Sequence, residues 1–172
     1  VGGGFAPIAT GDFNGDGKVD VIWNRAQGDM QMWLGTGTSF TGQFFRQYPV
    51  GWNLVGAADM NGDGKSDLLW HQPSTGRLAF WILNGATVSS EGLQTAGGGF
   101  VPIALGDFNG DGLVDIVWNR PQNDMQLWTG NGTSFTGQFL RNYPVGWNLV
   151  AAGDVDGDGK AVVTFVGASD YA

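Results

Sequence analysis

The chain of 172 residues is 42% hydrophobic and 13% aromatic, which is too apolar for a disordered chain. It has no cysteine, so disulfides and cysteine-bearing zinc sites are excluded. Its net charge of −8 argues against a nucleic-acid or anionic-membrane binder. No apolar stretch is long enough for a membrane-spanning helix, so we expect no membrane insertion. Residues 1–20 lack the features of a signal peptide, so an exported protein would already have lost its leader.

The sequence is a tandem duplication, and each half contains a weaker internal repeat. Residues 5–9 match residues 100–104, and residues 48–54 match residues 143–149. Four acidic loops recur at intervals of 47, 48 and 47 residues, beginning at Asp12, Asp59, Asp107 and Asp154. We therefore expect a single domain, residues 1–172, made of four repeats with the approximate bounds 1–48, 49–95, 96–143 and 144–172.

Each repeat is expected to form short β-strands. In the first repeat we predict four of them, at residues 8–10, 21–24, 30–34 and 40–47. The acidic loop lies between the first two strands, and a turn at Gly28-Asp29 separates the second from the third. No window keeps the apolar spacing of an amphipathic helix. Four strands in about 47 residues are typical of one blade of a β-propeller, in which each small sheet buries both faces against its neighbours.

The predicted fold class is therefore all-β, with antiparallel four-stranded propeller blades, three of them full and a fourth partial. The fourth repeat has room for two strands before Ala172. Three and a half blades cannot close a ring, and an open apolar edge aggregates unless it is covered. We expect either a fragment of a longer propeller or a ring completed by a second copy or another chain segment. The tryptophans expected in the blade core are Trp23, Trp33, Trp70, Trp81, Trp118 and Trp128.

The acidic loops follow the pattern D-x-[DN]-x-D-G-x-x-D, which indicates metal sites. Side-chain oxygens of positions 1, 3, 5 and 9 and the main-chain carbonyl of position 7 can surround a hard cation, and the glycine allows the loop to reverse. The predicted ligands of the first three sites are Asp12, Asn14, Asp16, Lys18 and Asp20; Asp59, Asn61, Asp63, Lys65 and Asp67; and Asp107, Asn109, Asp111, Leu113 and Asp115. Ligands that are all oxygen favour Ca²⁺ over zinc, copper or magnesium.

A fourth site is predicted to bind weakly or not at all. It keeps Asp154, Asp156, Asp158 and the carbonyl of Lys160, but Val162 stands at the closing position. An EF-hand is excluded, because it needs flanking helices and a glutamate at position 12, where the first three loops have tryptophan. The alternative of plain surface turns does not account for three full copies in register. Loops of this kind are expected to bind Ca²⁺ with a Kd on the order of 10⁻⁴ to 10⁻³ M, which favours an extracellular compartment.

These loops and the segments that follow them resemble a known family. They run into Asp-Val-Ile-Trp, Asp-Leu-Leu-Trp and Asp-Ile-Val-Trp, which look like the FG-GAP or VCBS repeats of integrin-α propellers and of many secreted bacterial proteins. Residues 35–40 and 130–135, followed later by Trp52 and Trp147, are also similar to the repeats of integrin-like fungal lectin propellers. The resemblance covers nearly the whole chain. It implies a calcium-binding propeller from a family that includes adhesion receptors, lectins and non-catalytic appendages of enzymes.

The rim opposite the acidic loops is the predicted ligand surface. Aromatic rings there could stack on sugars while neighbouring polar side chains bind the hydroxyl groups. The candidate residues are Asn24, Arg25, Asp29, Tyr48, Trp52, His71, Asn119, Arg120, Asp124, Tyr143 and Trp147. Two alternatives stand beside this interpretation. Arg25 and Asp29 could be an ion pair that holds a hairpin, and His71 could be an ordinary surface residue.

The sequence offers no recognisable catalytic constellation, so we predict that the chain is not an enzyme. It has one histidine, no cysteine nucleophile and no G-x-S-x-G turn. The predicted function is a secreted or cell-surface, calcium-binding module that binds a glycan or a cell-surface protein without catalysis. The alternative is a structural or assembly module attached to a larger secreted enzyme or toxin, with calcium as its only ligand.

Overall fold

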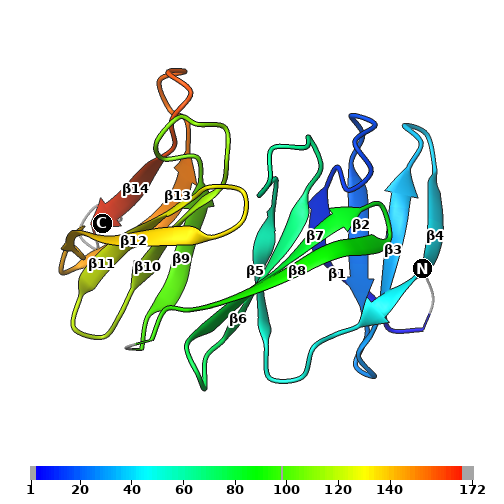
Figure 1. The fold of residues 1–172 in the computed structure, drawn as a ribbon, viewed down its shortest axis with the longest axis horizontal. Helices are drawn as coiled ribbons and strands as arrows, with labels where there is room; N and C mark the ends of the chain where they lie inside the picture. Colours follow the sequence, from blue (N-terminus) through cyan, green and yellow to red (C-terminus); the bar gives the residue numbers. More distant parts are fainter. Residues whose placement is uncertain (1–2, 98, 168–172) are drawn as a thin grey trace.

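The computed structural model describes residues 3–97 and 99–167, so the outer ends of the first and fourth predicted repeats lie outside the described residues. The described part of the chain forms strands and no helix. These strands make three four-stranded antiparallel sheets and one two-stranded sheet (Figure 1). The predicted fold class is confirmed: the protein consists of three propeller blades and part of a fourth.

Within each blade, neighbouring strands in the sequence are neighbours in the sheet. Blade 1 contains β1 (Ala6–Gly11), β2 (Asp20–Asn24), β3 (Asp29–Gly35) and β4 (Phe40–Gln47). Blade 2 contains β5 (Asn53–Ala58), β6 (Asp67–Gln72), β7 (Arg77–Asn84) and β8 (Thr87–Thr95). Blade 3 contains β9 (Val101–Gly106), β10 (Asp115–Asn119), β11 (Asp124–Gly130) and β12 (Phe135–Asn142). The half-blade contains β13 (Trp147–Gly153) and β14 (Val162–Gly167), so all strands predicted for the first repeat and both strands of the fourth are confirmed.

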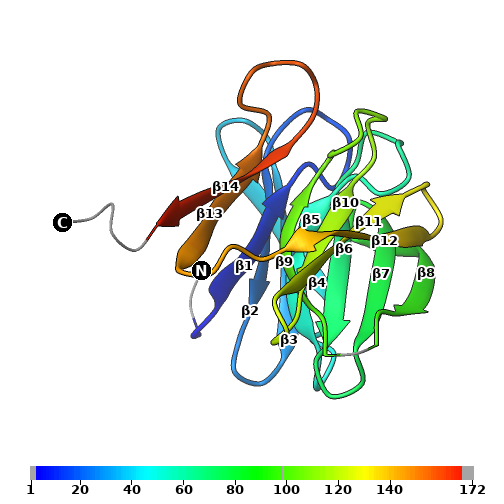
Figure 2. The same cartoon turned by 90° about the vertical axis from the view of Figure 1, so that its left-hand side faces the viewer.

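The first strand of each blade lies next to the first strand of the following blade. β1, β5, β9 and β13 contact one another in that order, from right to left in Figure 1. Figure 2 looks along this series from the side of the half-blade. Each of these strands carries a bulge, at Ile8, Val55, Ile103 or Val150. A bulge bends a strand and increases its twist. Because it recurs at one position, the four repeats share the same backbone geometry along their inner strands.

Both faces of the middle strands of blade 2 are buried, because this blade packs between blades 1 and 3. In β6, Trp70 belongs to the core shared with blade 1, whereas the adjacent Leu69 belongs to the core shared with blade 3. Alternate residues of a strand point to opposite faces, so a strand buried on both sides needs a continuous apolar run. Each fully buried side chain of this size contributes about 1.5–3 kcal/mol. Packing between blades therefore holds the arc together.

The face of blade 1 that points away from blade 2 is the exception, and we call it the leading face. Val19 and Phe40 are 61% and 49% exposed there, whereas their counterparts in blade 3, Val114 and Phe135, are 5% and 4% exposed because blade 2 covers them. The prediction of core tryptophans is confirmed for Trp70, Trp81, Trp118 and Trp128. Trp23 and Trp33 are only half-buried, because the described chain places no blade against the leading face.

Candidate functional site

The four acidic loops lie in a row on one rim of the blades, at the top of Figure 1. Each loop joins the first strand of a blade to the second. Hydrogen bonds connect the first loop to the second and the third to the fourth: the N–H of Ser66 donates to the carbonyl of Asp12 at 2.6 Å, and the N–H of Ala161 donates to the carbonyl of Asp107 at 2.5 Å. The second and third loops meet where the side chain of Leu113 packs against Gly62. The side chain of Lys65 also packs against Gly15 of the loop before it. The loops therefore form one continuous acidic surface.

The first aspartate of each loop organises the loop around its carboxylate. Asp12 accepts hydrogen bonds from the main-chain N–H groups of Gly15 and Gly17, both at 2.7 Å. Equivalent pairs of bonds are made by Asp59, Asp107 and Asp154. Gly15 and Gly17 have φ values of 78° and 76°, which residues with a side chain rarely adopt. Glycine is therefore required for the reversal that turns these N–H groups toward the carboxylate.

The closing aspartates are fully buried and bind the main chain. The carboxylate of Asp20 accepts hydrogen bonds from the N–H groups of Phe13 and Gly35, both at 2.8 Å. Asp67 and Asp115 make the same two bonds in their blades. Each closing aspartate thus ties its acidic loop to the end of the third strand of its blade. The sequence analysis did not predict this backbone-binding role, because Gly35, the second partner of Asp20, lies fifteen residues further along the chain. The one sequence signal for it was an aspartate at the start of an apolar strand.

Burial makes the charges of the closing aspartates Asp67 and Asp115 unfavourable and raises the pKa of both. For Asp67 burial raises the pKa to about 6, an effect that hydrogen bonds from Leu83 and Met60 partly offset. The negative charges of Asp63 and Asp59 raise the pKa further. A divalent cation in the loop would reverse this effect, because it attracts the carboxylates that now repel one another.

The donor set of these loops fits calcium. Asp12, Asn14 and Asp16 offer side-chain oxygens within five residues, and an oxygen that accepts one N–H keeps a lone pair for a metal. In the first two loops the lysine at position 7 offsets part of the charge: Lys18 lies 2.8 Å from Asp16, and Lys65 lies 3.6 Å from Asp63. The predicted ligand roles in the first three loops stay predictions.

The fourth loop gathers its carboxylates most closely. One carboxylate oxygen each from Asp154, Asp156 and Asp158 lie within 4.8 Å of one another. No other group of three such acidic or histidine ligands is this close among the described residues. The third position is aspartate here and asparagine in the other loops, and Val162 removes the closing carboxylate. This cluster could hold a metal, and the prediction of weak or absent binding there is untested.

On the opposite rim, the predicted ligand residues include two ion pairs that hold turns. The guanidinium of Arg25 pairs with Asp29 and lies 5.1 Å from the ring centroid of Phe5. In blade 3, Arg120 pairs with Asp124 in the same way, and its guanidinium lies 4.8 Å from the ring centroid of Phe100. A hydrogen bond from Gln47 and the pairing with Arg25 lower the pKa of Asp29. The alternative of a hairpin-holding ion pair is the one that the geometry favours.

The predicted tyrosines connect successive blades. The hydroxyl oxygen of Tyr143 accepts a hydrogen bond from the N–H of Leu149 at 2.9 Å, and its ring meets Phe165 edge-on. Tyr48 makes the same bond to Leu54 and meets Trp70 edge-on. Both side chains are therefore occupied with contacts inside the protein, which leaves little of either for a ligand.

The two tryptophans of this rim differ in exposure. Trp147 is 45% exposed at the start of β13, whereas Trp52 packs against the core between blades 1 and 2. The side-chain amide oxygens (Oδ1) of Asn24 and Asn119 are buried without a hydrogen-bond partner in the described part of the chain. The structure thus does not gather all the predicted ligand residues into one surface. Trp147 is the one that presents a large aromatic area to solvent.

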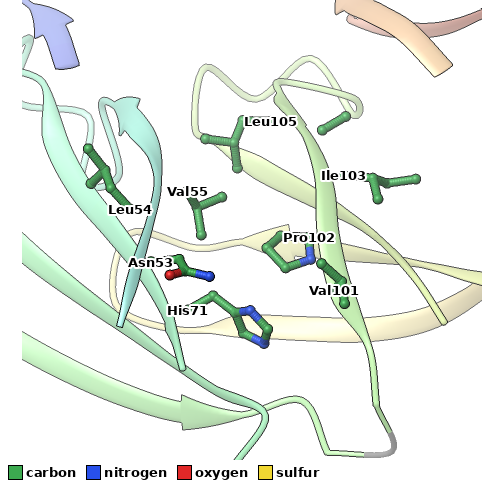
Figure 3. Close-up of a pocket in the computed structure, with 9 residues that line it drawn as sticks. Asn53, Leu54, Val55, His71, Val101, Pro102, Ile103 and Leu105 are labelled. Carbon is green, nitrogen blue, oxygen red and sulfur yellow. The ribbon is translucent and has the colours of Figure 1, made fainter. Parts of the chain in front are cut away.

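His71 is 3% exposed, so the interpretation as an ordinary surface residue is wrong. Its ring packs edge-on against Trp118, with 5.6 Å between ring centroids, and burial lowers its pKa. The imidazole borders a groove of about 440 Å³ between β5 and β9. Figure 3 shows Val55, Pro102 and Leu105 around this groove, whose lining is mainly apolar. The repeat places His71 where blades 1 and 3 have asparagine, and the aromatic contact explains its burial.

Comparison with known proteins identifies the repeat. No curated protein matches the chain, and the described residues contain no helix that could span a membrane. The model of the FG-GAP-like repeat matches three overlapping segments, residues 12–70, 59–118 and 107–163. Each match begins at the first aspartate of an acidic loop and ends within the second strand of the next blade. The chain belongs to the FG-GAP-like repeat family, and its blades are those of an FG-GAP repeat β-propeller.

Proposed function

We propose that the chain is a calcium-binding, non-catalytic propeller module of the extracellular space or cell surface, which binds a glycan or a cell-surface protein. The observation that carries this proposal is the row of four acidic loops on one rim, each with carboxylates arranged around a reversed backbone. FG-GAP membership supports a propeller module, and the loop chemistry supports calcium as its ion.

Calcium would act on stability and not on a reaction. In the first loop it would be held by Asp12, Asn14, Asp16 and the carbonyl of Lys18, with Asp20 contributing from the interior. Each site adds about 1.4 kcal/mol when free Ca²⁺ is ten times its Kd. Three sites together add about 4 kcal/mol, which corresponds to about 8–16 °C in melting temperature for a chain of this size.

A non-catalytic role is supported by the state of the acidic residues outside the loops. In the described chain these are Asp29, Glu91 and Asp124, and each is paired with an arginine. A hydrolase of the glycosidase type needs two carboxyl groups facing one bond. Carboxylates that are committed to arginine or to a metal loop do not supply such a pair.

Thermal unfolding and glycan binding test the two parts of this proposal. Excess EGTA should lower the melting temperature by about 8–16 °C, and restored Ca²⁺ should reverse this shift. On a glycan array, Trp147→Ala should lose binding while its melting temperature stays within 2–3 °C of the parent, because the side chain is 45% exposed. Trp147→Phe, which keeps an aromatic face, is the matched control. Array signals that the alanine variant leaves unchanged would contradict a sugar contact at Trp147.

A second candidate, a structural or assembly module, is favoured by the leading face of blade 1. The same residue types that blade 2 buries in blade 3 are exposed there, at Val19 and Phe40. A further blade, from a second copy or another chain segment, would cover them. The solution mass of the chain with and without Ca²⁺ tests this role: a multiple of 18.2 kDa supports it, and a stable monomer at high concentration contradicts assembly by the chain alone.

A further inference from the structure

A separate hollow of about 330 Å³ lies on the side of blade 2 that packs against blade 1. This volume falls within the range of about 300–1,000 Å³ typical of small-molecule sites. Its lining is aromatic and apolar with one carboxylate, and includes Pro49, Trp52, Trp70, Ala79, Trp81 and Glu91. None of the acidic loops contributes to it. We call it the tryptophan hollow.

The hollow exists in blade 2 because an alanine replaces a glutamine. In blades 1 and 3, the indole N–H of Trp33 and Trp128 donates to Gln31 and Gln126, at 3.0 Å and 2.9 Å. Ala79 stands at this position in β7, two residues before Trp81, and supplies neither the bulk nor the acceptor. The space that a glutamine side chain occupies in the other blades is therefore open beside Trp81.

Aromatic rings meet at the floor of the hollow. Trp70 is fully buried, and its ring centroid lies 4.8 Å from that of Trp81 at an interplanar angle of 50°. The indole nitrogen of Trp70 has no hydrogen-bond partner among the described residues. Trp52 reaches the same space from the segment that links blades 1 and 2. Three indoles thus converge on one space from two parts of the chain.

The positively charged guanidinium of Arg46 already covers the ring of Trp81. The guanidinium of Arg46, from blade 1, lies 4.3 Å from the ring centroid of Trp81 and pairs with Glu91 at 2.5 Å. Both charged side chains are well exposed, at 38% and 53%. A pair this exposed is weak and readily displaced. Trp81 and Glu91 together therefore attract a cation, and the protein's own arginine competes for them.

We propose that the tryptophan hollow is an aromatic cage for a quaternary ammonium group, as in choline and related compounds. Such a group has no N–H, so it is bound by π faces and a nearby carboxylate. Trp52 and Glu91 line the hollow, and Trp81, which is 7% exposed with the guanidinium of Arg46 over its ring, supplies a second π face when the ligand displaces that guanidinium. A sugar fits less well, because the lining contains no amide or hydroxyl side chain to pair with its buried hydroxyl groups. The site is independent of the calcium and glycan roles proposed above.

Titration with choline chloride tests the assignment directly. The chain, saturated with Ca²⁺, is titrated while tryptophan fluorescence and heat are followed. We expect saturable binding of choline, and binding at least tenfold weaker for the uncharged isostere 3,3-dimethylbutan-1-ol. Failure of choline to saturate, or equal binding of the isostere, would overturn the proposal. Because Ca²⁺ is present throughout, either result leaves the calcium test undisturbed.

Two variants locate the site. Ala79→Gln refills the hollow with the side chain that blades 1 and 3 hold, so it should melt like the parent yet bind choline at least tenfold more weakly. Arg46→Gln removes the internal competitor and should bind choline severalfold more tightly. Unchanged affinity in Ala79→Gln would place choline elsewhere and refute the assignment. Saturable binding of a neutral sugar that Ala79→Gln abolishes, with none of choline, would also refute it and give the hollow to carbohydrate.

Discussion

Replacing Asp67 separates the structural role of a closing aspartate from its role in metal binding. The side chain is fully buried and accepts hydrogen bonds from the N–H groups of Met60 at 3.0 Å and Leu83 at 2.8 Å. Asp67→Ala leaves both donors buried without a partner, at about 1–3 kcal/mol each. Removing the buried carboxylate charge is itself favourable and offsets part of this cost. We therefore expect the free energy of unfolding of the metal-free protein to fall by about 2–4 kcal/mol. That is a large share of the about 5–15 kcal/mol that stabilises a domain.

Asp67→Asn is the matched control for this experiment. It keeps one acceptor oxygen and removes the charge, so it should cost about 1 kcal/mol or less without metal. Urea unfolding followed by tryptophan fluorescence, in EGTA and in Ca²⁺, measures both variants. Both should lose the increment that Ca²⁺ gives at one site. If Asp67→Ala unfolds at the parent's urea midpoint in EGTA, the backbone-tying role of this aspartate is refuted.

One further prediction concerns the pH dependence of stability, and another concerns two glycines in the strands. Because the pKa of Asp67 is raised to about 6, the stabilisation that comes from protonating this carboxyl group is full below about pH 4 and is lost as the pH rises through 6, whereas its two hydrogen bonds remain. The gain in melting temperature on adding Ca²⁺ should therefore grow from pH 5 to pH 7. A gain that stays constant over this range would contradict the link between the raised pKa of Asp67 and calcium binding. Gly92→Ala places a methyl group in the Phe80 ring and should cost about 1–3 kcal/mol, whereas Gly153→Ala points into open space and should change urea unfolding by under about 0.5 kcal/mol.

The strands and the loops could be predicted because they depend on local periodicity. A run such as Val21-Ile22-Trp23 is apolar at every position, as two-sided burial demands, and the strand Asp20–Asn24 forms there. Asp12 and the glycines after it specify a reversed loop from their conformational preferences alone. Four repeats in register strengthened each of these expectations.

The contacts between blades could not be predicted, because they join residues far apart in the sequence. The expectation of an exposed His71 failed because its burial depends on Trp118 of the next blade. The tryptophan hollow likewise depends on Ala79 lying beside Trp81 within a packed interface. The sequence held one signal of this hollow: blade 2 has Ala79 at the position where blades 1 and 3 have Gln31 and Gln126.

Calorimetric titration of the metal-free chain with CaCl₂ tests the central claim most directly. The account predicts saturable heat from three sites of comparable affinity, with a Kd on the order of 10⁻⁴ to 10⁻³ M, and a weaker or silent fourth. Asp63→Asn should remove one of the three. No heat at millimolar Ca²⁺, together with thermal unfolding that EGTA leaves unchanged, would contradict the account.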